Sequence, residues 1–222
     1  MSTYWLLQHE IETPPGTLTE WLNERGKNVR ALYLPDTRGD LPRLEAGDKL
    51  LVLGGSMNTD EESLYPWMTA EKALIQDAAT RGIAYLGICL GAQLFCEALG
   101  GKVRRMPHWE VGWWPVQEHG QSGAVPAFHW HRYECVLPRG AEVLASSKAC
   151  EVQIYKASPR QLCFQFHPEV DRAWIEASLG PTGTEGLEGF VQSAPEMLHG
   201  HELHQPALRD WFFAKLDQWD RS

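Results

Sequence analysis

The sequence has little positive charge and no long apolar run. Its 222 residues include 20 Lys and Arg against 29 Asp and Glu, which gives a formal net charge of −9. An acidic surface repels phosphate backbones, so we expect no nucleic acid partner. No segment resembles a signal peptide, and no run approaches the roughly 18 apolar residues of a membrane span. These absences predict a cytoplasmic location and no membrane partner.

The five cysteines lack the pattern of a disulfide framework or a structural zinc site. Their number is odd, their spacing is wide, and no Cys-x-x-Cys pair occurs, so we expect neither bridges nor a zinc cluster. Four of them are expected to be buried small hydrophobes, which leaves the question whether one has another role. The cysteines are Cys89, Cys96, Cys135, Cys150 and Cys163.

The overall composition is that of an ordinary globular chain. Apolar residues make up 43% and charged residues 22% of the sequence. A chain of this length can bury a core without covalent staples. We interpret residues 1–222 as one domain with a helical tail from about residue 171.

Strand and helix signals alternate over the first hundred residues. Helices are expected at 17–26, 66–82 and 90–99, the first opened by a capping box from Thr17 to Glu20 and the first two ended by glycines. Apolar runs predict strands at 5–9, 29–34, 49–53 and 83–88. This alternation predicts an α/β fold with a doubly wound, mostly parallel sheet flanked by helices, of the flavodoxin-like type.

The middle of the chain, residues 102–165, changes to short β-rich runs. We expect later strands and an antiparallel extension of the same sheet. The tail is expected to be helical, with a loop at 180–186 and apolar residues at helical spacing over 208–219 that dock on the body. The runs of the middle segment are predicted to be broken by Pro107, Pro115, Pro126, Pro138 and Pro159.

Gly87-Ile88-Cys89-Leu90-Gly91 places a cysteine between two glycines where a strand meets a helix. A sharp strand-to-helix turn crowds the residues two before and two after its centre, so both must be small. Such a turn raises the sulfur of Cys89 above the sheet edge, where the helix dipole stabilises a thiolate. The Leu90 amide then points toward the position of an oxyanion.

His167 stands at the end of an apolar strand, where active groups on open parallel sheets gather. Pro168 keeps the preceding residue extended, and alternate residues of extended chain face the same side. Glu169 can therefore hold one ring nitrogen of His167 while the other faces Cys89. This arrangement is typical of a nucleophile, base and orienting acid.

Three motifs together resemble those of class I glutamine amidotransferases, most closely the amidotransferase portion of GMP synthetase and its free-standing relatives. They are LGGSMN at 53–58, LGICLGAQ at 86–93 and QFHPEV at 165–170. The resemblance implies that Cys89 attacks the glutamine side-chain amide and that His167, oriented by Glu169, moves the protons. A γ-glutamyl thioester would form, and water would release glutamate. The amides of Gly55 and Leu90 would form the oxyanion hole.

The same resemblance implies the residues beside the substrate. Gly54, like Gly55, lets backbone amides approach, and Gln93 is similar to the family position that contacts bound glutamine. His129 and Trp130 belong to a His-Trp-His stretch that borders the pocket in the family. The family commonly continues with small and acidic residues, whereas Arg132-Tyr133 follows here, which puts the substrate preference in doubt.

Other histidines and tryptophans are expected to be structural. His129 and His131 share one face of a strand, but the sequence shows no third ligand, so no metal site is predicted. His199, His201 and His204 are expected in a solvated loop. The tryptophans between Cys89 and His167 (Trp109, Trp113, Trp114 and Trp130) are interpreted as core packing, with an aromatic pocket wall as the alternative.

The chain also lacks a phosphate-binding loop, and no synthetase domain fits after residue 172. No cofactor is predicted. Three functions stay open: an amidotransferase-type hydrolase of glutamine that supplies ammonia to a separate synthetase subunit or works alone, a γ-glutamyl peptidase using the same triad, and a non-catalytic binding protein of the same fold.

Overall fold

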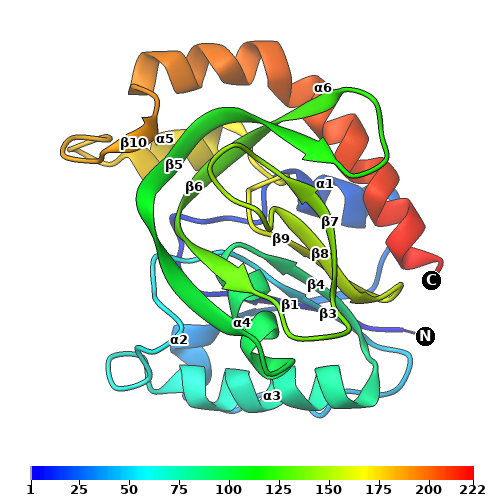
Figure 1. Ribbon diagram of the computed structural model, residues 1–222. Coiled ribbons are helices and arrows are strands. Elements are labelled where there is room, and N and C mark those ends of the chain that lie inside the picture. Colours follow the sequence, from blue (N-terminus) through cyan, green and yellow to red (C-terminus); the bar gives the residue numbers. More distant parts are fainter. Residues whose placement is uncertain (1) are drawn as a thin grey trace.

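A computed structural model describes residues 2–222, whose strands form one mixed sheet (Figure 1). The strand order is β10-β5-β7-β8-β9-β4-β3-β1-β2, and β6 pairs with β5. Five neighbouring strands are parallel: β2 (Val29–Tyr33), β1 (Tyr4–Gln8), β3 (Lys49–Val52), β4 (Ala84–Ile88) and β9 (Gln161–Phe164). Their order is that of a flavodoxin-like sheet, so the predicted fold class is confirmed.

Helices cover both faces of the parallel strands. One face carries α1 (Thr17–Glu24), α5 (Arg172–Leu179) and α6 (Ala194–Asp220), and the other carries α3 (Trp67–Arg81) and α4 (Leu90–Ala98). The short α2 (Leu34–Thr37) follows β2. Leu51 of β3 packs in the first core, and its neighbours Leu50 and Val52 pack in the second. The near-continuous apolar strand reflects this burial on both sides.

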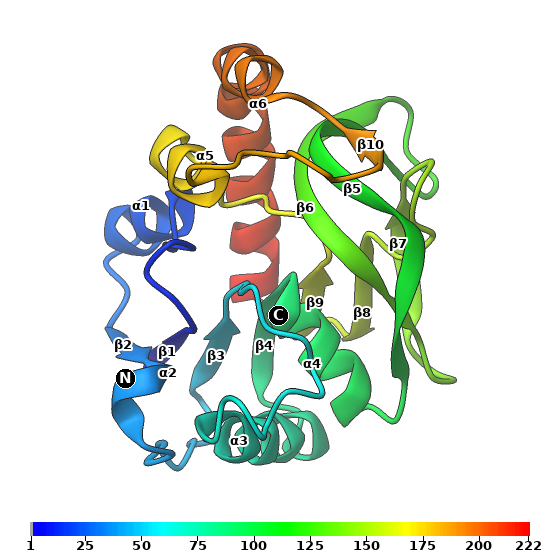
Figure 2. The same cartoon turned by 90° about the vertical axis from the view of Figure 1, so that its left-hand side faces the viewer.

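The antiparallel extension consists of β5 (Lys102–Glu118), β6 (Ala124–Val136), β7 (Glu142–Ser146) and β8 (Ile154–Ser158), with β10 (Gly189–Val191) parallel to β5. Figure 2 shows the long β5–β6 ribbon arching on the side of the molecule away from β1 and β2. The extension holds the pocket residues that lie between Cys89 and His167 in the sequence.

The prediction that prolines break these strands was wrong for three of them. β5 runs through Pro107 and Pro115, and β6 runs through Pro126. A register shift between Arg105 and Glu110 accommodates Pro107, since proline is tolerated at bulges. Pro115 lies opposite Pro126, which suits a pair position that needs no ladder hydrogen bonds.

Two local predictions about helices were also wrong. The capping box at Thr17 does not form: Gly16 precedes α1 with φ of 48°, and the Thr17 hydroxyl donates to the Glu169 carbonyl over 3.3 Å. A capping box does occur at the start of α6, between Ser193 and Glu196. The histidines expected in a loop, His199, His201 and His204, lie within α6.

The last helix docks on the body as the apolar spacing predicts. Trp219 is buried, and the Trp21 indole donates to Asp217 over 2.8 Å. The Lys49 ammonium lies 2.7 Å from an Asp220 carboxylate oxygen. Among residues 2–222 no helix is both long and apolar enough to span a bilayer.

Candidate active site

The carboxyl ends of β3, β4 and β9 bring together the three motifs. Gly54 and Gly55 follow β3, Cys89 follows β4, and His167 lies just beyond β9. Because β3 pairs with β4 and β4 pairs with β9, these strand ends are adjacent. Residues more than a hundred positions apart therefore meet at one edge of the sheet.

The turn at Cys89 has the expected strained backbone. Cys89 has φ of 49°, and Arg38 is the one other non-glycine residue of 2–222 with positive φ. A Cβ on Gly91 would lie 2.2 Å from the Val52 carbonyl oxygen, and one on Gly87 would lie 2.8 Å from the Gly91 oxygen. Side chains at either glycine would push the helix off the strand, so both glycines are required by close approach.

His167 and Glu169 form a buried pair. The His167 Nδ1 atom lies 2.9 Å from a Glu169 carboxylate oxygen, and the two side chains are 2% and 1% exposed. Although desolvation opposes the charged ring, the charges of Glu169 and Cys89 raise the pKa of His167 to about 10. The Glu169 backbone is held in turn, because the Thr17 amide donates to its carbonyl over 2.9 Å. The ring is thus oriented from both ends of the chain.

The sulfur of Cys89 lies beside His167 at the floor of a cavity. Cys89 is 6% exposed and lines the cavity together with His167. A Cβ on Gly54 would lie 2.8 Å from His167 Cε1 and 3.4 Å from Cys89 Cβ, so the glycine leaves space for the ring and the thiol to approach. The Gln165 amide, which the sequence did not single out, donates to the sulfur over 3.9 Å.

The backbone amides of Gly55 and Leu90 are free to act as donors. Neither nitrogen donates a hydrogen bond within residues 2–222. Leu90 is the first residue of α4, where an amide has no partner in the helix and the dipole favours negative charge. Both residues adjoin the Cys89 side of the cavity, and Gly55 lines it.

A buried pair missed at the sequence level fixes the Gly54–Gly55 peptide. His9 Nδ1 donates to the Gly54 carbonyl over 2.9 Å, and His9 Nε2 lies 2.8 Å from a Glu71 oxygen. Both side chains are fully buried, and the charge of Glu71 raises the pKa of His9 against desolvation. In a trans peptide the next amide points opposite the carbonyl, so His9 directs the Gly55 N–H away from itself. No local pattern signals this pairing, since 62 positions separate the two residues.

The cavity beside Cys89 has a volume of about 450 Å³, within the range typical of small-molecule sites. Gln93 and Trp130 line it as expected from the resemblance, and Gln93 donates to Gln165 over 3.3 Å. His129 is fully buried and lies outside the lining, whereas His131 lies within it. The aromatic wall is partly realised, because Trp109 also lines the cavity.

The expectation that His129 and His131 have no third ligand was wrong. Glu110 lies opposite His131 in the β5–β6 register, and its carboxylate lies 3.0 Å from His131 Nε2. No sequence spacing could signal this contact, because Glu110 is on the partner strand.

Comparisons with known proteins place the chain in a family. Residues 17–191 match the family model described as glutamine amidotransferase class-I, so the chain belongs to the class-I glutamine amidotransferases. It is 31% identical over 206 residues to the glutamine amidotransferase-like protein YfeJ of Salmonella typhimurium, covering 85% of this chain and 86% of that one.

Two further relatives bear on the activity. Gamma-glutamyl peptidase 2 of Arabidopsis thaliana is 31% identical over 151 residues, covering 60% of this chain and 59% of that protein. A crystal structure of a glutamine amidotransferase from Methylobacillus flagellatus superposes with a TM-score of 0.90 at 25% identity, covering 100% of this chain and 95% of that one.

Proposed function

We propose that the protein hydrolyses the side-chain amide of glutamine, or of a related γ-glutamyl compound, through a thioester on Cys89. The observation that carries the proposal is the placement of Cys89 on a strained turn beside the buried His167–Glu169 pair, at the floor of a cavity. A thiolate and an imidazolium held together in this way are the starting state for attack on a carbonyl carbon.

The reaction would proceed in two halves. In the first, the Cys89 sulfur bonds to the amide carbon, the oxyanion accepts from the Gly55 and Leu90 amides, and His167 gives a proton to the departing ammonia. In the second, His167 takes a proton from water, the hydroxide attacks the thioester, and the proton returns to the thiolate–imidazole pair as glutamate leaves. Glu169 keeps the ring oriented in both halves.

The substrate would be held by the cavity lining around this centre. Gln93 and Trp130 are proposed to contact the glutamine moiety, and the absence of a side chain on Gly54 leaves room for it above the thiol.

A separate synthetase is a candidate partner that would accept the ammonia. The support is a likeness to a glutamine-hydrolyzing GMP synthase chain of Methanoregula boonei that is itself one part of a larger enzyme. The two chains are 31% identical over 160 residues, covering 66% of this chain and 78% of that one.

The test is an assay of ammonia and glutamate release from glutamine, with asparagine as the matched non-substrate. Mass spectrometry after treatment with a glutamine-mimicking alkylator should locate a single adduct on Cys89, and glutamine should slow its formation. No ammonia release from any γ-glutamyl compound, together with alkylation elsewhere, would refute the proposal.

A γ-glutamyl peptidase is the second candidate, favoured by Arg132 and Tyr133 in the cavity lining. The Arg132 guanidinium lies 5.7 Å from the centre of the Trp109 ring, and its Nε atom is buried without a partner. A cation so placed suits the carboxylate of a γ-glutamyl dipeptide. Comparing kcat/KM for glutamine and γ-glutamyl dipeptides in wild type and Arg132→Gln decides: loss confined to dipeptides supports the peptidase.

Replacing Glu71 by glutamine should lower kcat by about 10-fold to 100-fold and leave KM within about twofold. The change removes the charge that keeps His9 bonded to the Gly54 carbonyl, so the Gly55 amide loses its fixed direction. The effect should be smaller than the roughly 10²–10³-fold loss caused by deleting an oxyanion donor outright.

Steady-state kinetics of Glu71→Gln beside Glu62→Gln, which changes an ion pair near the surface, provide the comparison. A rise in KM with unchanged kcat would show that His9 and Glu71 do not position the oxyanion donor.

A further inference from the structure

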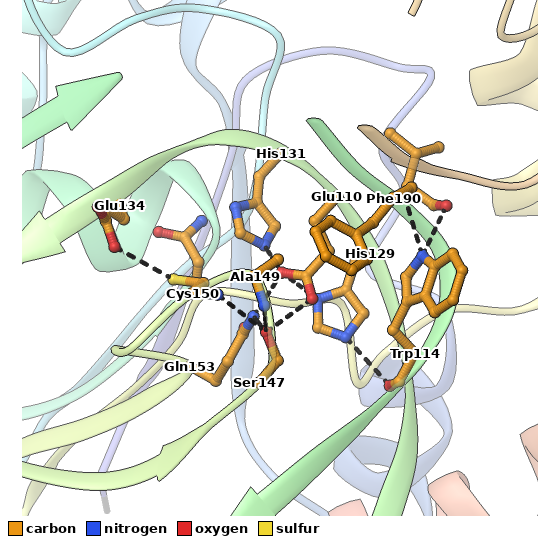
Figure 3. Close-up of polar contacts among 12 residues, drawn as sticks. Glu110, Trp114, His129, His131, Glu134, Ser147, Ala149, Cys150, Gln153 and Phe190 are labelled. Atoms are coloured by element: carbon orange, nitrogen blue, oxygen red, sulfur yellow. Dashed lines mark hydrogen bonds and ion pairs between the residues drawn. The ribbon is translucent and has the colours of Figure 1, made fainter. Parts of the chain in front are cut away.

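Three buried side chains outside the Cys89 centre converge between β5 and β6 (Figure 3). Glu110, His129 and His131 are 1%, 0% and 3% exposed. Glu110 lies opposite His131 in the strand register and Gly112 lies opposite His129, so the three side chains share one side of the ribbon. One ligand atom from each lies within 4.8 Å of the others.

The far nitrogen of each ring faces a backbone carbonyl. His129 Nε2 lies 3.3 Å from the Trp114 oxygen, and His131 Nδ1 lies 3.0 Å from the Tyr133 oxygen. A carbonyl only accepts, so these nitrogens carry the protons. A neutral ring then has its lone pair on the near nitrogen, which is the one turned toward Glu110.

The near nitrogens have no hydrogen-bond partner. His129 Nδ1 and His131 Nε2 lie 3.4 and 3.0 Å from the same Glu110 oxygen, yet neither makes a hydrogen bond. That oxygen already accepts from the Gln153 amide over 2.6 Å, and the other accepts from the Ser147 hydroxyl over 2.7 Å. Buried polar atoms without partners are costly, so a cluster of acceptors facing one another needs a positive charge among them.

We propose that Glu110, His129 and His131 bind a divalent transition-metal cation of the Zn²⁺ class. Two imidazole nitrogens and one carboxylate oxygen are preferred ligands of such ions. Bonds of about 2.0–2.1 Å in a tetrahedron separate ligand atoms by roughly 3.3 Å, close to the spacings found between these atoms. Donation of the far ring nitrogen to a carbonyl is the usual support of a metal-bound histidine.

The role of this ion would be structural rather than chemical. The site is closed to solvent, and Cys89 and His167 are not among its ligands. The ion would fasten β5 to β6 beneath Trp130 and His131, which form part of the cavity wall. The inference does not depend on the proposed hydrolysis, so its test uses binding and stability.

The test uses tag-free Cys89→Ala protein, which lacks the one cysteine that could bind zinc together with His167. After chelation and dialysis, titration with ZnCl₂ should show one equivalent bound per chain and a raised melting temperature. Co²⁺ should give the visible absorption of a low-symmetry site. Glu110→Gln in the same background should weaken Zn²⁺ binding by about 100-fold or more.

His199→Gln is the matched control, because that exposed histidine on α6 lies outside the cluster and its loss should leave binding unchanged. Circular dichroism checks that Glu110→Gln folds, and anomalous scattering at the zinc edge from Zn²⁺-soaked crystals of the Cys89→Ala protein gives a second readout. Binding of less than about a tenth of an equivalent, or equal binding by Glu110→Gln, would overturn the proposal and leave protons as the charge in the cluster.

Discussion

Cys89→Ala is expected to lower the rate of amide hydrolysis by about 10⁴-fold or more, to the background of the assay. Without the thiol no thioester can form, and water lacks a base placed to activate it directly on the amide. The loss should appear in kcat, because Gln93 and Trp130 still line the cavity that binds the substrate. Ammonia release at saturating substrate measures it.

Cys96→Ala is the matched control. Cys96 is also a cysteine of α4, but it is buried in the opposite core against α3 and contacts no cavity residue. It should retain activity within about threefold. Turnover by Cys89→Ala within tenfold of wild type would mean that another group is the nucleophile.

His167→Gln is expected to cost about 10⁴-fold in kcat, since both proton transfers pass through this ring. The variant should also change how stability depends on pH. The pKa of His167 is raised from 6.5 to about 10 in the folded protein by Glu169 and Cys89, despite burial. The folded state therefore binds more protons than the unfolded chain between these two values.

The sign of the effect follows from that difference. The stabilisation by His167 is fully present below pH 6.5 and is lost as the pH rises toward about 10. Urea unfolding of wild type and His167→Gln across this range should show a difference in the free energy of unfolding that shrinks with rising pH. His9 is present in both proteins, so its own titration cancels. A difference independent of pH would contradict the charged pair.

Much of the fold could be predicted because its signals are local. The alternation of apolar runs with helical segments determines β1, β3, β4, α3 and α4, and each boundary has a proline or glycine of known effect. The long β5 and β6 could not be predicted in the same way. Prolines normally end strands, and their tolerance here depends on a bulge and on the partner strand.

The candidate site divides along the same line. Gly87, Cys89 and Gly91 form their turn from neighbouring residues alone, and His167 and Glu169 pair two positions apart, so sequence spacing already contains that geometry. Their approach to one another was inferred from the general rule that strand ends share an edge.

The contacts that sequence spacing could not reveal all join distant polar groups. His9 meets Glu71, the Thr17 amide holds Glu169, and Glu110 meets its two histidines across β5 and β6. The sequence by itself determined the order of strands and helices, the turn at Cys89 and the pairing of His167 with Glu169. Only the tertiary structure decided which buried polar groups meet, because each must find a partner wherever the packed chain supplies one.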